Sequence, residues 1–279
     1  MSKIPKIIHY CWLSGDELPQ RVKDCIESWK TILPDYEIVL WDMNRFDVQS
    51  VPWVKQACEV RRWAFAADYI RLYALYNYGG IYLDSDIRML KSLDPYLDHG
   101  GFSCIEWDEK EYLYPANRKN NNNGINIEFA LIGAQKGHPL IKAFMEYYET
   151  RDFIVNGEMD MEPMPRPMTP IAQKYGFDRS TYWNHQVLEG DFHIYPYDFC
   201  PGRNNTFFNE PMVTHNSVAF HLHHTSWTNY KVGYDKLHSP YTEFRLHLKE
   251  FLRNVREDVF VRKNYVMHNG QKCKKKRNK

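Results

Sequence analysis

Hydrophobic residues near the start of the chain form short apolar runs that alternate with apolar positions at helical spacing. Residues 6–12 are rich in β-branched and aromatic side chains and end at Ser14-Gly15, so we predict a buried strand there. Residues 18–29 carry apolar side chains every three or four positions, as a helix does, and residues 36–41 form a second apolar run. A strand, a helix and a strand in this order predict a βαβ unit with a largely parallel sheet.

The longest helical pattern covers residues 55–78 and predicts a single helix. Gly79-Gly80 follows it directly, and glycine is the usual residue just past a helix end. Residues 81–83 then read as a short buried strand that runs into Asp84-Ser85-Asp86.

The second half of the chain has a looser pattern. Residues 117–126 form an asparagine-rich loop that we expect to be too polar for the core, and residues 157–170 carry four prolines and four methionines, which predicts a mobile flap. Further predicted elements are strands at 127–132 and 218–223 and helices starting at Pro139 and covering about 241–260. With no repeat and no linker, we predict one α/β domain over 1–261.

Residues 262–279 form a basic tail that we expect to be disordered, because Lys272, Lys274, Lys275, Lys276, Arg277 and Lys279 crowd its end. One interpretation is an inert, solvated end. The other is peripheral contact with anionic lipid headgroups, which attract such clusters.

Composition narrows the function classes only slightly. A net charge of +1 gives no general attraction to nucleic acid. The six cysteines are scattered, with no Cys-x-x-Cys pair, which favours reduced thiols. No signal peptide and no run of 18 apolar residues is seen, so we expect a cytoplasmic protein, with the inner face of the membrane as the site of any peripheral contact.

Asp84 and Asp86 are the first candidates for chemistry. They lie two residues apart at a predicted strand end, where ligand sites of open α/β sheets form, so both carboxylates can face one side. Carboxylates and phosphates are the ligands that Mg²⁺ and Mn²⁺ prefer. Asp68 and Arg71, three apart on the preceding helix, are either a simple ion pair or a polar contact for a sugar or ribose.

Three blocks of the sequence resemble the DXD-containing sugar-binding glycosyltransferases, which include fungal initiating α-mannosyltransferases, capsular and lipopolysaccharide sugar transferases and clostridial glucosylating toxins. The central block is Ala66-Ala67-Asp68-Tyr69-Ile70-Arg71 followed by Tyr78-Gly79-Gly80-Ile81-Tyr82-Leu83-Asp84-Ser85-Asp86. The opening residues 4–15 are similar to the family's first strand, and residues 219–227 resemble its C-terminal His and Ser-Trp segment.

The resemblance implies a GT-A fold, a nucleotide-diphospho-sugar donor, Mn²⁺ or Mg²⁺, and retention of anomeric configuration. It also implies roles for single residues. Trp12 would stack on the base, Asp68 and Arg71 would hold the ribose and sugar, and Tyr82 would line the nucleotide pocket. Asp84 would reach the ribose and the metal, Asp86 would bind the metal directly, and His221 would complete the metal shell or touch the diphosphate. Ser226 and Trp227 would contact the diphosphate.

Some assignments stay open at this point. The acceptor-side polar residue is Asn126 or Glu128, because the family's Asn-Ala pair is absent here, and His223 and His224 compete with His221 for the metal. We expect UDP-galactose or UDP-glucose as donor, with GDP-mannose second. The expected acceptor is a hydroxyl of a bacterial surface polysaccharide or of a lipid-linked glycan.

Two other classes of protein compete with this interpretation. Haloacid-dehalogenase-type phosphatases also place Asp-x-Asp at a strand end, but the position two residues further is usually Thr or Val there and is Arg88 here. A sugar-binding domain without catalysis would be favoured by loss of either aspartate, and both are present.

Overall fold

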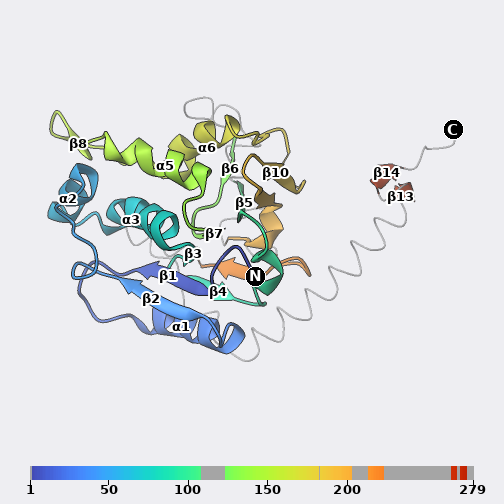
Figure 1. Ribbon diagram of the computed structural model, residues 1–279, viewed down its shortest axis with the longest axis horizontal. Helices are drawn as coiled ribbons and strands as arrows, with labels where there is room; N and C mark the ends of the chain where they lie inside the picture. Colours follow the sequence, from blue (N-terminus) through green and yellow to red (C-terminus); the bar gives the residue numbers. More distant parts are fainter. Residues whose placement is uncertain are drawn as a thin grey trace. The chain divides into compact units, whose positions relative to one another are not determined.

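The computed structural model describes residues 2–107, 123–181, 183–202 and 213–222, together with the backbone of two short strands near the C-terminus. The described residues fall into two compact units (Figure 1). The first comprises the described parts of 1–212 and 216–229, and the second those of 213–215 and 230–279. Within these described ranges, no helix has both the length and the apolar character needed to cross a membrane.

The first unit is built on a mixed, mostly parallel sheet. Its strands are β1 (Ile7–Cys11), β2 (Glu37–Trp41), β3 (Gly80–Leu83), β5 (Gly101–Trp107), β6 (Ile125–Ile127), β7 (Leu131–Ala134), β10 (Gln186–Leu188) and β11 (Phe192–Tyr195). The order is β10-β11-β5-β7-β3-β1-β2, with β6 paired to β5. Strands β2, β1, β3, β5 and β11 share one direction, and β7 runs against its neighbours β3 and β5. The predicted α/β fold with a mostly parallel sheet is confirmed.

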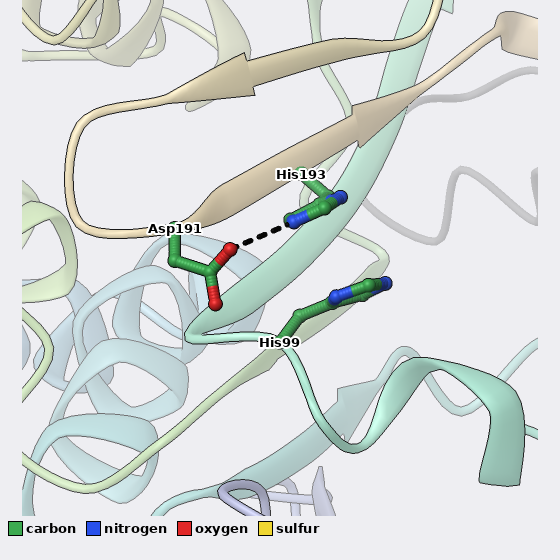
Figure 2. A group of neighbouring side chains, drawn as sticks. All are labelled: His99, Asp191 and His193. Atoms are coloured by element: carbon green, nitrogen blue, oxygen red, sulfur yellow. Dashed lines mark hydrogen bonds and ion pairs between the residues drawn. The ribbon is translucent and has the colours of Figure 1, made fainter.

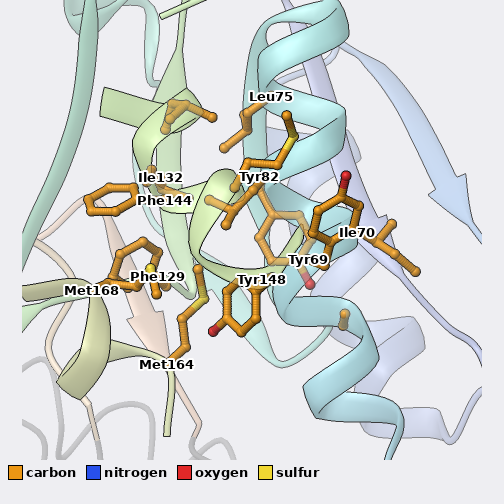
Figure 3. Close-up of a cluster of buried hydrophobic side chains, with 14 of the residues drawn as sticks. Tyr69, Ile70, Leu75, Tyr82, Phe129, Ile132, Phe144, Tyr148, Met164 and Met168 are labelled. Carbon is orange, nitrogen blue, oxygen red and sulfur yellow. The ribbon is translucent and has the colours of Figure 1, made fainter. Parts of the chain in front are cut away.

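Helices cover both faces of this sheet (Figure 1). They are α1 (Gln20–Ile32), α2 (Pro52–Glu59), α3 (Trp63–Tyr78), α5 (Pro139–Glu149) and α6 (Pro165–Gln173), with short 3₁₀ turns η1 (Asp94–Tyr96) and η3 (Tyr197–Phe199). Alternate residues of β3 divide the core: Ile81 and Leu83 pack in the cluster that contains α1, and Tyr82 packs in the cluster of α3, α5 and α6. Figure 3 shows this second cluster around Tyr82, Phe129 and Met164.

The helix predicted over residues 55–78 is in fact two helices, α2 and α3. Arg61 adopts a positive φ of 56°, and the backbone N–H of Arg62 donates to the carbonyl of Ala57 at 2.8 Å. These are the features of a C-terminal helix cap, although the left-handed residue is arginine instead of the usual glycine. The end of α3 follows the prediction, because Gly79 has φ 69° and donates to the carbonyl of Leu75.

Three predictions for the middle of the chain are wrong. The flap expected over 157–170 contains strand β9 (Glu158–Met159), which pairs with β8 (Ile154–Val155) just before it, and most of helix α6 at its other end. Proline is accepted in the first turn of α6 because it needs no N–H there. Asn126, the last residue of the asparagine-rich segment expected to lie outside the core, is only 3% exposed within β6, and residues 117–122 lie outside the described residues. The single strand predicted at 127–132 is replaced by the ends of β6 and β7.

The C-terminal predictions are described only in part. Within the tail expected to be disordered, the backbone of β13 (Tyr265–His268) pairs antiparallel with that of β14 (Gln271–Lys274). The helix predicted over 241–260 lies outside the described residues.

Gly80 lets the chain enter β3 close to β1, and we predict that Gly80→Ala destabilises the fold. Gly80 has φ 108°, and an added Cβ would lie 2.7 Å from the carbonyl oxygen of Ile7. Left-handed strain and overpacking each cost about 1–3 kcal/mol. Gly137 is the matched control, since it has φ 73° with nothing near its Cβ position. Chemical denaturation should show a larger loss for Gly80→Ala than for Gly137→Ala, and equal losses would contradict the packing argument.

Candidate active site

A tight turn after β3 holds Asp84 and Asp86. The N–H of Asp84 extends the sheet by donating to Ala130 at 2.8 Å, and the N–H of Ile87 donates back to the carbonyl of Asp84 at 2.9 Å. The chain then continues as β4 (Ile87–Met89). The two aspartates therefore lie in a turn whose position is fixed by hydrogen bonds on both sides.

His221 is brought beside this turn by a second pair of strands. Strand β12 (Ala219–His221) pairs antiparallel with β4, and His221 is opposite Ile87. The Nε2 atom of His221 lies 3.4 Å from Oδ1 of Asp86. Burial would lower the pKa of His221, but Asp86 and Glu128 outweigh burial and raise this pKa well above its usual value.

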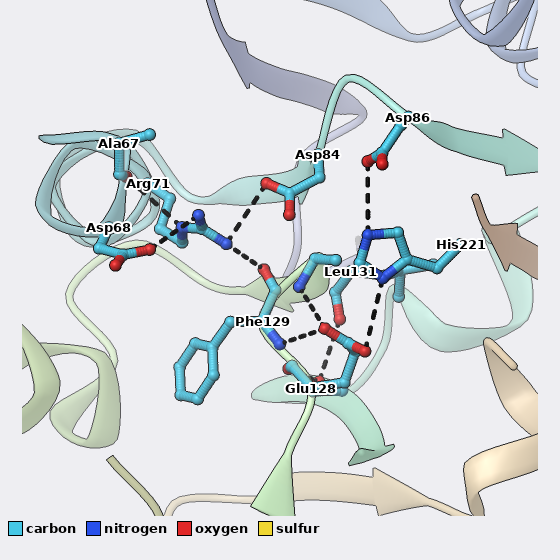
Figure 4. Close-up of polar contacts among 11 residues, drawn as sticks. Ala67, Asp68, Arg71, Asp84, Asp86, Glu128, Phe129, Leu131 and His221 are labelled. Carbon is cyan, nitrogen blue, oxygen red and sulfur yellow. Dashed lines mark hydrogen bonds and ion pairs between the residues drawn. The ribbon is translucent and has the colours of Figure 1, made fainter. Parts of the chain in front are cut away.

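Glu128 lies on the far side of the His221 ring (Figure 4). Its Oε2 is 3.7 Å from Nδ1 of His221, and its Oε1 accepts hydrogen bonds from the N–H groups of Phe129 and Ala130 at 2.9 and 2.8 Å. The carboxylate is thus fixed by backbone donors and faces the imidazole nitrogen opposite the one that faces Asp86. Carboxylates in this position commonly orient metal-binding histidines.

Arg71 connects α3 to the aspartate turn. Its guanidinium lies 2.9 Å from Asp68 and 3.4 Å from Asp84, and it donates to the carbonyl of Phe129 at 2.9 Å. It also lies 4.6 Å above the ring of Tyr82. Burial alone would lower the pKa of Arg71, but the two aspartates and Tyr82 raise it, so the side chain stays cationic. Burial and Asp84 raise the pKa of Asp68 to about 7, although Arg71 opposes them.

These side chains line a cleft of about 500 Å³ beside the carboxyl ends of β1 and β3. The structure brings together eight of the predicted site residues in its lining: Trp12, Asp68, Arg71, Tyr82, Asp84, Asp86, Glu128 and His221. Asn126 does not line the cleft, and its Oδ1 atom has no hydrogen-bond partner among the described residues. Ser226, Trp227, His223 and His224 lie outside the described residues.

The cleft also contains residues that were not among the predicted site residues. Glu106 lines it from β5, next to Asn126 on β6. Pro163, Met164 and Pro165 reach it from the start of α6. Glu106 lies in an ordinary strand pattern, so the sequence alone gives no sign that it lines the cleft. Only its pairing with Asn126 of β6 indicates this position.

Asp84, Asp86 and His221 have the chemistry and spacing of a divalent-metal site. One donor atom from each lies within 4.8 Å of the others. Two carboxylates with one imidazole suit Mn²⁺ well, and Mg²⁺ accepts the carboxylates. The residues therefore fit the predicted cofactor, while the identity of the ion stays a prediction.

Trp12 stands at the nucleotide end predicted for the cleft, and we expect Trp12→Ala to weaken donor binding. Its indole N–H donates to the carbonyl of Asp16 at 2.7 Å, which holds the ring at the lining. Losing one aromatic stacking partner for a base costs about 1–3 kcal/mol. Calorimetry should show this loss for Trp12→Ala and none for Trp183→Ala, an exposed tryptophan outside the cleft. Unchanged affinity with an intact fold would make Trp12 a packing residue.

Comparison with known proteins shows what part of this site is similar to. Residues 19–103 match the family described as "Glycosyltransferase sugar-binding region containing DXD motif". The matched segment contains Asp68, Arg71, Tyr82, Asp84 and Asp86, five of the eight predicted residues that line the cleft. The resemblance drawn from the sequence is confirmed over this segment.

The curated relatives are fungal enzymes. The chain is 34% identical over 143 residues to Inositol phosphoceramide mannosyltransferase 3 of Schizosaccharomyces pombe, a match over 50% of this chain and 35% of that protein. It is 33% identical over 103 residues to Mannosyl phosphorylinositol ceramide synthase SUR1 of Saccharomyces cerevisiae, over 36% of this chain and 27% of that protein. The matches thus span about a third or less of the relatives' lengths.

Among solved structures, "PaToxG Glycosyltransferase" has a TM-score of 0.44 and 18% identity, covering 61% of this chain and 69% of that chain.

Proposed function

We propose that this protein is a metal-dependent, retaining glycosyltransferase that moves a hexose from a nucleotide-diphospho-sugar to a hydroxyl acceptor. The observation that carries the proposal is the convergence of Asp84, Asp86 and His221 in one cleft, beside Arg71 and Asp68. A divalent ion held by the first three residues would neutralise the diphosphate as it leaves.

The protein's own residues would bind and orient the donor. Trp12 stacks on the base, and Asp68 accepts hydrogen bonds from sugar or ribose hydroxyls. Arg71 holds Asp68 and Asp84 in place, since its guanidinium contacts both carboxylates. Met164 and its proline neighbours cover the cleft on the α6 side and keep water from the donor.

Retention of the anomeric configuration without a covalent intermediate agrees with the contacts of Glu128. Oε1 of Glu128 accepts hydrogen bonds from two backbone N–H groups, and Oε2 faces Nδ1 of His221 at 3.7 Å. This arrangement suits a positioning residue better than a covalent nucleophile. We therefore favour substitution on the same face of the sugar, with the acceptor oxygen attacking as the diphosphate leaves.

The names of the curated relatives change our ranking of the candidate donors and acceptors. Both are mannose-transferring enzymes whose names specify an inositol-containing ceramide. We place GDP-mannose first and UDP-glucose or UDP-galactose second, and a lipid-linked hydroxyl before a bacterial polysaccharide. The basic tail would bind a membrane surface that contains such an acceptor. The cytoplasmic location stays a prediction.

The experiment is a transfer assay with GDP-mannose, UDP-glucose and UDP-galactose, each offered with Mn²⁺, with Mg²⁺ or with a chelator. Mass spectrometry would detect a hexose added to inositol-containing lipids or to simple glycosides, or released by hydrolysis. We expect turnover of one donor, abolished by the chelator. Donors left intact under every metal condition, by protein that binds them, would favour a sugar-binding domain without catalysis.

His221→Ala should lower metal-dependent turnover at least about tenfold, which corresponds to about 1.4 kcal/mol in the barrier. The reason is that His221 is the described histidine that faces the aspartate turn, and Glu128 orients its other nitrogen. His224→Ala, at a competing histidine of the same sequence block, should cost much less. Steady-state rates over a range of Mn²⁺ concentrations measure both, and a larger loss for His224→Ala would show that the assignment is wrong.

A further inference from the structure

A second group of metal-binding side chains lies outside the cleft. One donor atom each from His99, Asp191 and His193 falls within 4.8 Å of the others, and Figure 2 shows the three side chains facing one another. His99 precedes β5, Asp191 precedes β11 and His193 lies in β11, so the group sits where these two parallel strands begin. None of the three lines the cleft.

The carboxylate of Asp191 is held so that one oxygen is anchored and the other faces a histidine. Oδ2 accepts from Nζ of Lys3 at 2.8 Å and from the N–H of Gly100 at 2.9 Å, while Oδ1 lies 2.9 Å from Nε2 of His193. Anchoring by a lysine and a backbone N–H is the kind of support that positions metal-binding carboxylates.

The imidazole rings of His99 and His193 contact each other and two further side chains. The rings of His99 and His193 stack with centroids 3.6 Å apart and planes 14° apart. Nε2 of His99 lies 3.0 Å from the hydroxyl of Tyr195, and Nδ1 of His193 lies 3.0 Å from Nε2 of His185. These contacts occupy Nε2 of His99 and Nδ1 of His193. The candidate metal donors are therefore Nδ1 of His99 and Nε2 of His193, and a bound ion would replace the contact between Nε2 of His193 and Asp191.

The protonation states suit a metal ligand set. Two positively charged rings stacked at this separation would repel each other, so the arrangement favours at least one neutral imidazole. Metal binding needs neutral imidazole, and the nitrogen on the opposite side of each ring then carries the proton.

We propose that His99, Asp191 and His193 form a binding site for a divalent transition metal, of which zinc is the representative. Two imidazoles and one carboxylate favour zinc, cobalt, nickel or copper over Mg²⁺ and Ca²⁺, which prefer oxygen ligands. Three protein ligands leave room for a water in a four-coordinate site. The ion would join the loop before β5 to the start of β11, and its role is structural and independent of the proposed transfer reaction.

The test is calorimetric titration of the metal-stripped full chain with zinc chloride, in saturating Mg²⁺. The variants are Asp191→Asn, which keeps the shape of the side chain, His193→Ala, and a double variant Asp86→Asn/His221→Ala that removes two potential zinc ligands from the cleft. We expect the double variant to keep one zinc site of wild-type affinity. Asp191→Asn and His193→Ala should weaken that site at least about tenfold. His215→Ala, an exposed histidine outside the group, should bind like the wild type.

Circular dichroism on each variant separates loss of the site from loss of the fold, and the near-isosteric Asp191→Asn keeps the test valid if His193→Ala does not fold. Zinc-induced thermal stabilisation should disappear in the same variants that lose the calorimetric site. Wild-type zinc affinity in folded Asp191→Asn would overturn the proposal. So would loss of all zinc binding in the double variant, because the ion would then belong to the cleft.

Discussion

Asp86→Asn should lower sugar transfer by about a hundredfold to a thousandfold while leaving the fold intact, the cost of losing one preorganised charge-stabilising contact. Asp86 lies in the turn after β3 and faces His221 at 3.4 Å. The amide keeps the volume of the side chain but removes the negative charge that a divalent ion requires. Steady-state transfer rates at increasing Mn²⁺ measure the loss, and the weaker metal affinity should raise the Mn²⁺ concentration needed for half of the residual activity.

Two other substitutions make this result interpretable. Asp84→Asn should lower transfer by a similar factor but disturb metal affinity less, because the carboxylate of Asp84 also pairs with Arg71 at 3.4 Å. Asp98→Asn is the matched control, since Asp98 is exposed and outside the cleft. Near wild-type transfer by Asp84→Asn and Asp86→Asn in chelator-treated buffer would refute the account.

Arg71→Ala should reduce the free energy of unfolding by about 3–5 kcal/mol and also eliminate transfer. Arg71 is 6% exposed and is the cationic partner of Asp68 and Asp84. Removing one member of a buried ion pair leaves the other charge uncompensated, which has a cost of this size. The carbonyl of Phe129 would also lose a hydrogen-bond donor. Chemical denaturation monitored by circular dichroism measures the change.

The matched control is Arg45→Ala. Arg45 is an exposed arginine whose guanidinium lies 5.4 Å over the ring of Trp41, and surface substitutions of this kind usually change stability by about 0.5 kcal/mol or less. Similar small losses for both arginines would show that the network around Arg71 contributes little to the fold.

The sequence was most informative where local pattern and tertiary environment agree. Strand β1, helix α1, strand β2 and the Gly79 stop were predicted close to their observed bounds, because apolar spacing and glycine chemistry act locally. The break at Arg61 was missed because a left-handed arginine leaves no mark in composition. Helix α6 was missed because its three prolines, at positions 165, 167 and 170, suggested a loop, whereas packing against the core favours a helix.

The site itself was predicted in part. Asp68 lies three positions before Arg71, and Asp84 lies two positions before Asp86. Pairs this close can be recognised in the sequence as short motifs. Glu128 was one of two candidates, with Asn126, for the acceptor-side polar residue, and that role stays a prediction. Its contact with His221 could not be predicted, because it depends on how β12 pairs with β4. The group of His99, Asp191 and His193 could not be seen in the sequence, because 92 positions separate the first two residues, and they meet through the pairing of β5 with β11.

Calorimetric titration of GDP and UDP into the wild-type protein and Asp86→Asn, each with Mn²⁺ and with a chelator, tests the central claim most directly. The claim is that Asp84, Asp86 and His221 bind a nucleoside diphosphate through a divalent ion. We predict that one nucleotide binds the wild-type protein with Mn²⁺, and that the chelator or Asp86→Asn weakens this binding at least about tenfold. Nucleotide binding of equal strength in all four conditions, or none in any of them, would contradict the account.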